Sequence, residues 1–242
     1  MPGPPVIRAI IFDFDGLMVD TEEPIFRVWQ RIYRERGEEL PLEQWLTIIG
    51  GASSATFEPI IDLARRTGTT LDPSELETLE RRYYREATTT QQLLPGVRGY
   101  LDDATRLHLR TAIASSSGRR WIDEHLERLA ILGCVDTIVC KDDVSRTKPD
   151  PELYLTALDR LAAHAREAIA LEDSSNGIKA AKAAGLYCVA VPNAMTASMD
   201  LSQADLRLTT LEEMPLADLI RQTNSARSPR PAPGRPGAPI SD

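Results

Sequence analysis

Short, nearly continuous runs of apolar and β-branched residues recur along the chain and predict its strands. The first run covers residues 6–12 and has no alternation of apolar and polar positions. Such a run is typical of a strand that is buried on both faces, as in a parallel sheet covered by helices on both sides. Similar runs follow at residues 111–114, 137–140, 168–171 and 188–191. Because helix-like sequence separates them, the pattern predicts an α/β fold with a Rossmann-like parallel sheet.

Between residues 23 and 92 these strand-like runs stop. Apolar positions such as Phe26, Trp29 and Ile32 recur instead at helical spacing. The sequence Asp-Pro-Ser-Glu at 72–75 has an N-cap residue, a first-turn proline and a capping-box acid, and predicts the start of a further helix. We therefore predict an all-helical insert, residues 23–92, in an α/β core. The core would comprise residues 1–22 and 93–223.

The last residues, 224–242, have a different composition. They hold five prolines and two glycines, with few apolar side chains. Such a segment cannot bury enough apolar surface to offset the entropy lost on ordering. We therefore predict a disordered proline-rich tail.

Composition restricts the kind of partner. The 242 residues include 28 Lys plus Arg and 36 Asp plus Glu, so the formal net charge is −8. An acidic chain of this kind is not expected to bind nucleic acid or an anionic membrane, because it has few cations to replace the counterions of phosphates. The charge still permits a locally positive pocket for one small anion. A length of 242 residues allows one sizeable core with a small accessory domain.

The cysteines and the N-terminal sequence indicate which cellular compartment is expected. Cys134, Cys140 and Cys188 form no CxxC pair and leave an odd thiol, which is typical of a reducing compartment. The first residues lack the apolar region of a signal peptide, and no stretch approaches the roughly 20 apolar residues of a membrane span. A soluble cytoplasmic protein, either a monomer or a small homo-oligomer, is expected.

Polar residues of unusual kinds follow four of the predicted strands, where a parallel sheet places its functional loops. Asp13-Phe14-Asp15-Gly16 follows the first strand, and two acids there can ligate a hard cation. The Ser-Ser-Ser-Gly sequence at 115–118 offers hydroxyl and N–H groups to an anion. Lys148 precedes a proline in a turn that could aim its ammonium group at a phosphate. Glu172 and Asp173 form a second acid pair, which requires a cation or lysine nearby to offset charge repulsion.

Each of these four signals also has an ordinary structural explanation. An Asp-x-Asp sequence arises by chance in an acidic protein, and a serine-rich turn is commonly a loop with an N-cap. A lysine near a turn is normally solvated, and acids are favoured at helix N-termini. Their joint order along the chain is more informative than any one of them.

That order resembles the haloacid dehalogenase superfamily of phosphohydrolases over residues 6–216. The superfamily's four motifs correspond to residues 12–16, Ser115, Lys148-Pro149 and Glu172-Asp173. The stretches at 171–178 and 183–185 are similar to the branch that includes β-phosphoglucomutase and sugar-phosphate phosphatases. This branch carries a helical cap between the first and second motifs, in agreement with the predicted insert.

The resemblance implies roles for the acids. Asp13 would be the nucleophile and would form an aspartyl-phosphate. Asp15 would protonate the leaving alcohol and then act as the base that activates water. Mg²⁺ would be held by the Asp13 carboxylate, the Asp15 backbone carbonyl and Asp173. Glu172 would lie nearby as an additional ligand or as the holder of a water molecule.

The resemblance also implies roles for residues around the phosphate. Ser115, the backbone of Ser116 and Lys148 would hold the transferring group and offset its charge. Thr21 would hydrogen-bond the Asp15 region or the hinge of the cap. Arg119 would touch the leaving group or, equally, lie on a helix surface.

The cap decides between hydrolysis and isomerisation. A mutase of this branch has a His shortly after the Asp-Thr pair, where this chain has Glu-Glu-Pro-Ile at 22–25. It also has cationic residues around a cap loop, whereas residues 48–54 include none. The second phosphate of a bisphosphate would lack an obvious partner, although Arg81, Arg82 and Arg85 could supply one. A phosphatase acting on a small phosphorylated metabolite, such as a sugar or polyol phosphate, is the first prediction and a β-phosphoglucomutase-type mutase the second.

Two further interpretations are less favoured. A catalytically silent binding protein for a phosphorylated metabolite would need no acid–base carboxylate beside a metal site. A Ser-His-Asp hydrolase would need a histidine near Ser115, and His108, His125 and His164 lie in helix-like stretches without ligand spacing. We assign these histidines no role.

Overall fold

A single parallel sheet organises the molecule. The computed structural model describes residues 6–50, 57–70, 72–88 and 91–227. Within them the strands lie in the order β3-β2-β1-β4-β5-β6, and all pairs are parallel. The strands are β1 (Ala9–Phe12), β2 (Arg110–Ala114), β3 (Thr137–Val139), β4 (Ala168–Glu172), β5 (Tyr187–Ala190) and β6 (Leu206–Arg207). The five predicted strands are confirmed. The sixth has only two residues, too few to produce a pattern.

The register of the central strands determines which loops meet. Phe12, the last residue of β1, lies opposite Ile113 in β2 and Leu171 in β4. The chain therefore leaves β1, β2 and β4 at the same edge of the sheet. The residues that follow these three strands are brought together although they are far apart in the sequence.

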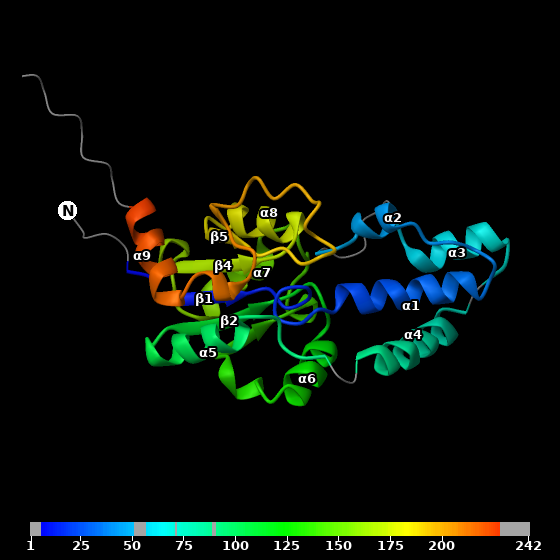
Figure 1. The fold of residues 1–242 in the computed structure, drawn as a ribbon, viewed down its shortest axis with the longest axis horizontal. Helices are drawn as coiled ribbons and strands as arrows, with labels where there is room; N and C mark the ends of the chain where they lie inside the picture. The colour runs from blue at the N-terminus through cyan, green and yellow to red at the C-terminus, as the bar shows by residue number, and fades with distance from the viewer. Residues whose placement is uncertain (1–5, 51–56, 71, 89–90, 228–242) are drawn as a thin grey trace, which may run out of the picture.

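Helices cover both faces of the sheet (Figure 1). The core helices are α5 (Val97–Arg106), α6 (Arg119–Arg128), α7 (Glu152–Arg160), α8 (Ser175–Ala183) and α9 (Leu216–Arg227). Short 3-10 turns are η1 (Leu132–Cys134), η2 (Lys141–Asp143), η3 (Ala165–Glu167) and η4 (Leu211–Glu213). Ile10 and Phe12 of β1 pack in the cluster that includes α5, α6 and α9, whereas Ile11 packs with α7 and α8. Alternate residues of one strand thus serve two hydrophobic layers, and the predicted α/β class with helices on both faces is confirmed.

A group of four helices lies beyond the sheet, at the right of Figure 1. They are α1 (Glu22–Arg34), α2 (Leu42–Leu46), α3 (Pro59–Thr67) and α4 (Pro73–Thr88). We refer to α1–α4 as the cap. It has its own buried cluster, which includes Trp29, Ile32 and Leu63. The described residues between α1 and α4 contain no strand.

Two connecting segments join the cap to the core and run side by side. Val19, before α1, forms an antiparallel bridge with Leu93, after α4. The Leu94 N–H donates to the Met18 carbonyl at 2.9 Å. The cap also touches the core at a third place, where the Asn176 side chain donates to the Ile49 carbonyl at 3.1 Å. The cap is therefore hinged on one pair of segments and docked on α8.

The C-terminal boundary differs from the prediction. Residues 224–227, predicted to be disordered, belong to the end of α9. The helix persists because Thr223 is fully buried and because the Arg227 guanidinium donates to the Ala165 carbonyl at 3.4 Å and lies over the Tyr187 ring. The proline-rich composition begins only at Pro229. The rest of the predicted tail, 228–242, lies outside the described residues.

None of the helices in the described part of the chain is both long and apolar enough to span a bilayer.

Candidate active site

Three carboxylates gather at the carboxyl edge of the sheet. Asp13 follows β1, Glu172 ends β4 and Asp173 comes next. All three are buried, and one oxygen from each lies within 4.8 Å of the others. Such a group of oxygens, without a balancing cation, would be strongly repulsive.

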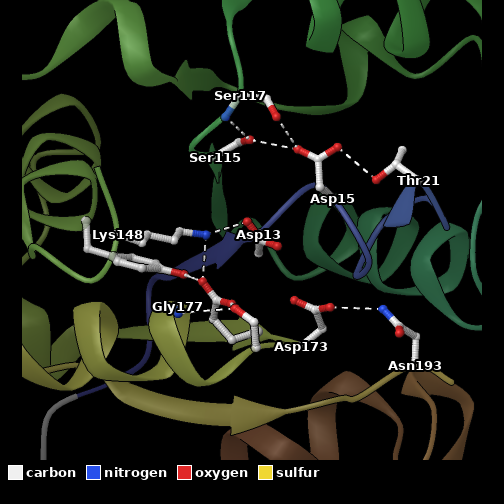
Figure 2. Close-up of polar contacts among 12 residues, drawn as sticks. Asp13, Asp15, Thr21, Ser115, Ser117, Lys148, Asp173, Gly177 and Asn193 are labelled. Atoms are coloured by element: carbon white, nitrogen blue, oxygen red, sulfur yellow. Dashed lines mark hydrogen bonds and ion pairs between the residues drawn. The ribbon is translucent and has the colours of Figure 1, made fainter. Parts of the chain in front are cut away.

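Lys148 supplies one positive charge to this group. Its side chain is buried, and its ammonium group ion-pairs with Asp13 Oδ1 and with Glu172 Oε1, the latter at 2.7 Å. Tyr154 in α7 donates its hydroxyl to the same Glu172 oxygen. Glu172 is therefore engaged mainly in holding Lys148, which points at Asp13 (Figure 2).

Burial makes the charged forms of these acids costly. It raises the pKa of Asp13 from 3.8 to about 8, against the opposing effect of Lys148. Burial likewise raises the pKa of Asp173 well above its ordinary value, and the Asp13 charge adds to the effect. Burial acts to lower the pKa of Lys148, but the attraction of Asp13 and Glu172 outweighs it and leaves the pKa raised. The site therefore favours a further cation.

Asp173 shows where that cation would bind. Its Oδ2 accepts a hydrogen bond from the Asn193 side chain at 2.9 Å (Figure 2). The same Asn193 amide also donates to the Gly16 carbonyl at 2.9 Å. Its Oδ1 is buried and has no hydrogen-bond partner within the described residues. A buried carboxylate oxygen without a donor is costly unless an ion satisfies it. Oxygen ligands of this kind fit Mg²⁺.

Gly16 allows this close approach. Its φ of +81° lies in the left-handed region. A Cβ at this position would lie 2.3 Å from Asp173 Oδ2. A side chain here would therefore both strain the turn and displace the carboxylate.

Asp15 lies on the other side of the site and is held by four donors. Its Oδ1 accepts from the Thr21 hydroxyl at 2.9 Å and from the Trp121 indole N–H at 2.8 Å. Its Oδ2 accepts from the Ser115 hydroxyl at 3.1 Å and from the Ser117 hydroxyl at 2.6 Å. Asp13 and Asp15 are two residues apart in sequence but have entirely different partners.

The loop after β2 supplies the hydroxyls. Ser115 is fully buried, and its Oγ also accepts the Ser117 backbone N–H at 3.0 Å. The Ser116 hydroxyl is buried, and no described residue hydrogen-bonds it. It is thus available to an incoming oxygen.

Arg119 is directed away from this site. Its guanidinium donates to the Ile138 carbonyl at 2.9 Å and to Asp143 at 3.2 Å, beside the end of β3. The structure therefore does not bring Arg119 to the predicted leaving group, because the Ile138 carbonyl in β3 and the Asp143 carboxylate hold it. Asp13, Asp15, Thr21, Ser115, Ser116, Lys148, Glu172 and Asp173, in contrast, are brought together.

A cavity of about 600 Å³ lies between this edge of the sheet and the cap. Its core wall includes Asp13, Asp15, Ser115, Ser116, Ser117, Trp121 and Lys141. Its cap wall includes Glu22, Ile25, Trp45, Glu77, Glu80, Arg81 and Tyr84. Burial, together with the charges of Asp15 and Asp13, raises the pKa of Glu22 to about 8. The cavity thus joins a buried charged site to a wall of carboxylates and aromatic rings.

Sequence reasoning missed four residues that hold this site. Trp121 and Tyr154 lie on helices, where an aromatic residue is indistinguishable from core packing. Asn193 follows β5, so the rule that located the other strand ends could have found it. Ser117 lies in the serine turn but was given no role.

Comparison with known proteins agrees with this geometry. The sequence model of the haloacid dehalogenase-like hydrolases matches residues 10–191. “Putative phosphatase YhcW” of Bacillus subtilis (strain 168) is 41% identical over 220 residues, which cover 91% of this chain and 99% of that protein. The “Phosphorylated carbohydrates phosphatase” of Thermotoga maritima is 32% identical over 184 residues, or 74% of this chain and 82% of that protein.

A solved structure shows the same fold. The crystal structure of CbbY from Rhodobacter sphaeroides in complex with phosphate has a TM-score of 0.74 and 28% sequence identity. The similarity covers 88% of this chain and 99% of that chain. The resemblance inferred from the four motifs is confirmed: this chain belongs to the haloacid dehalogenase-like hydrolase family.

Proposed function

We propose that this protein is a Mg²⁺-dependent phosphatase that hydrolyses a small phosphorylated metabolite through an aspartyl-phosphate on Asp13. The chain is a phosphoric monoester hydrolase by class, since it belongs to a hydrolase family and its relatives are named phosphatases. The observation that supports this mechanism is that two acids close together in the sequence have different partners, and so can perform different steps. Asp13 faces Lys148 and the carboxylate group, whereas Asp15 is held by four donors across the cavity.

The two acids perform different steps. An Asp13 oxygen attacks phosphorus, the bond from phosphorus to the alcohol oxygen breaks, and Asp15 gives that oxygen its proton. Asp15, now a carboxylate, takes a proton from water as the water attacks the phosphoryl group. The bond between Asp13 and phosphorus breaks, and inorganic phosphate leaves with both acids restored.

The remaining residues hold charge and position. Ser115, the Ser116 backbone and Lys148 bind the oxygens of the transferring group. Asp13, the Asp15 carbonyl and Asp173 would hold Mg²⁺, and Glu172 completes the group while it fixes Lys148. The bound ion would offset the repulsion between an anionic nucleophile and an anionic phosphate.

The cap wall supports a hydroxyl-rich substrate, such as a sugar or polyol phosphate. Glu22 and Glu80 offer carboxylate oxygens to hydroxyl groups, and Trp45 offers an apolar ring surface. One relative is named for phosphorylated carbohydrates. Cytoplasmic location, and a monomer or small homo-oligomer without nucleic-acid or membrane partners, remain predictions from composition.

A mutase is the second candidate, because two cations line the same cavity. Arg81 and Lys141 could meet a second phosphate, although Arg81 is paired with Glu77 at 2.6 Å. Conversion of β-glucose 1-phosphate into glucose 6-phosphate without net phosphate release would favour this candidate.

The test is release of phosphate from a panel of phosphorylated sugars and polyols, with Mg²⁺ and with EDTA. We expect release only with the metal, and its loss in Asp13→Asn. Intact mass after rapid quenching should show one added phosphoryl group on the wild-type chain and none on the variant. Full turnover by Asp13→Asn would overturn the nucleophile assignment. Metal binding without any turnover would favour the silent binding protein.

A further inference from the structure

Trp121 contacts the proposed general acid in a way that no other donor does. It lies in the first turn of α6 and donates its indole N–H to Asp15 Oδ1 at 2.8 Å. The other side-chain donors to Asp15 in the described chain are hydroxyls, from Thr21, Ser115 and Ser117. A hydroxyl rotates and can donate or accept, whereas an indole N–H only donates, in a direction fixed by its ring. Trp121 therefore provides the one directional restraint among these four contacts.

The indole ring is itself fixed by packing. Its centroid lies 4.5 Å from that of Tyr84, in cap helix α4, and 4.7 Å from that of His125. His125 is buried, and its Nδ1 lies 2.8 Å from the Trp121 carbonyl oxygen. These contacts place Trp121 between a cap side chain and a buried core side chain.

A hydrogen bond closes this group. The Tyr84 hydroxyl and His125 Nε2 are 3.1 Å apart, so the cap helix bonds directly to the residue that supports Trp121. Phe14, which lies between the two catalytic acids in sequence, packs edge-on against His125 at 5.8 Å. A continuous series of contacts, through Tyr84, His125 and Trp121, thus connects the cap to Asp15, the proposed proton donor. Each contact has an ordinary length.

We propose that Trp121 is a positioning residue that sets the orientation of Asp15 for proton transfer to the leaving alcohol. The inference rests on the proposed phosphatase function and adds a residue to it. With Oδ1 held by the indole N–H, Oδ2 is the oxygen left to transfer the proton, and its partners Ser115 and Ser117 have hydroxyls that can donate or accept. As the ester bond breaks, this proton moves from Oδ2 to the alcohol oxygen. Trp121 continues to donate to the resulting carboxylate.

The need for a proton from Asp15 depends on the leaving group. An alkyl alcohol is a poor leaving group and needs the proton of Asp15, whereas p-nitrophenolate leaves without one. Loss of orientation at Asp15 therefore slows phosphoryl transfer from an alkyl phosphate to Asp13 far more than transfer from an aryl phosphate. A loss of packing alone would slow both reactions to a similar extent.

The experiment compares kcat/KM for glycerol 2-phosphate and p-nitrophenyl phosphate at saturating Mg²⁺, because kcat/KM reports the steps up to loss of the alcohol and excludes the later hydrolysis of the aspartyl-phosphate. In Trp121→Phe, which keeps a ring but loses the N–H, we expect the alkyl-to-aryl ratio of kcat/KM to fall by about tenfold or more. The same fall is expected when Trp121 is replaced by benzothienylalanine. That replacement exchanges only the N–H for sulfur and so retains the packing even where phenylalanine does not.

Tyr100→Phe is the matched control. Tyr100 lies in α5 and donates its hydroxyl to the Met214 carbonyl at 2.7 Å, and it does not line the cavity. The alkyl-to-aryl ratio of this variant should equal that of the wild type. A ratio unchanged in both Trp121 variants would overturn the proposal. Failure of the wild type to hydrolyse either ester would instead count against the phosphatase function.

Discussion

The two walls of the active-site cavity differ in how deeply their charged side chains are buried. The core wall includes Asp13, which follows a strand and is held from behind by Lys148 beside Glu172, and these three residues are each less than 5% exposed. The cap wall presents side chains from helices, and the side chains of Arg81 and Glu77 are 53% and 61% exposed. A buried charge depends on its partner, whereas an exposed pair is screened by water. We therefore expect the proposed chemistry to depend on a few buried interactions with large effects, and the exposed Arg81–Glu77 pair of the cap wall to have a small one.

Removal of Lys148 is the strongest test of this contrast. Lys148→Met removes the buried positive charge that contacts both Asp13 and Glu172. We expect the free energy of unfolding to fall by about 3–5 kcal/mol at neutral pH without Mg²⁺. Phosphate release should fall by at least about 10³-fold, because the transferring group also loses its cation. Urea unfolding and a phosphate-release assay measure the two effects.

Lys182→Met is the matched control for that variant. Lys182 pairs with Asp205 at 2.5 Å, but the two side chains are 32% and 30% exposed. The cost should be about 0–1 kcal/mol, with turnover retained. Equal losses in the two variants would show that burial does not distinguish the core wall from the surface.

The buried acids also predict how stability depends on pH. The folded-state pKa of Asp13 is about 8, above its ordinary value of 3.8, and that of Asp173 is raised as well. Between these values the folded state binds more protons than the unfolded state, so stability falls as pH rises from about 4 to about 8. The slope is at most about 1.4 kcal/mol per pH unit for each such acid.

Mg²⁺ should oppose this fall. The ion binds the deprotonated carboxylates, so its stabilising effect should grow as pH rises. Thermal unfolding with Mg²⁺ and with EDTA, at several pH values, measures the difference. Asp13→Asn should flatten the EDTA curve, since one of the titrating acids is removed. A wild-type EDTA curve that rises with pH over this range would contradict the assignment.

The same contrast explains what the sequence could and could not predict. Asp13 and Glu172 were found because each follows an uninterrupted apolar strand, and parallel register alone brings such positions together. Trp121 and Tyr154 were not found, because helix periodicity indicates that a residue faces inward but not which atom its polar group meets. Of the cap wall, the sequence singled out only Arg81, for the same reason. The end of α9 was placed too early because composition outweighed the local contacts of Arg227.

The contact between the cap and the core predicts an effect of intermediate size on kcat/KM. Gly50 has a φ of +73°, and a Cβ there would lie 2.0 Å from Ser174 Oγ. Gly50→Ala should therefore separate the cap loop from α8. We expect kcat/KM for a sugar phosphate to fall by about tenfold, because closure excludes water and completes the site.

Gly68→Ala separates this docking effect from backbone strain. Gly68 has a similar φ of +66°, but nothing lies within 4 Å of the position of its Cβ. Both substitutions carry a conformational cost of about 1–2 kcal/mol. Only Gly50→Ala is expected to lower kcat/KM. Equal kinetic losses in the two variants would mean that strain, and not contact with Ser174, is responsible.

The smallest expected effect concerns the cap cation. Glu77 pairs with Arg81 at 2.6 Å, and both side chains are more than half exposed. Glu77→Gln should therefore change stability by no more than about 0.5 kcal/mol, but it leaves the Arg81 charge uncompensated at the cavity. We expect kcat/KM for a sugar bisphosphate, relative to the monophosphate, to rise by about two- to threefold.

Glu23→Gln is the control for the ratio of kcat/KM between bisphosphate and monophosphate. Glu23 pairs with Arg27 at the same helical spacing, at 2.5 Å, and neither residue lines the cavity. The ratio should not change in this variant, because the altered charge lies away from the substrate. If both variants raise the ratio equally, the preference reflects the overall charge of the cap. If only Glu77→Gln raises it, the Glu77–Arg81 pair keeps the cap wall from attracting a second phosphate, and the weak exposed wall contributes to the choice of hydrolysis over isomerisation.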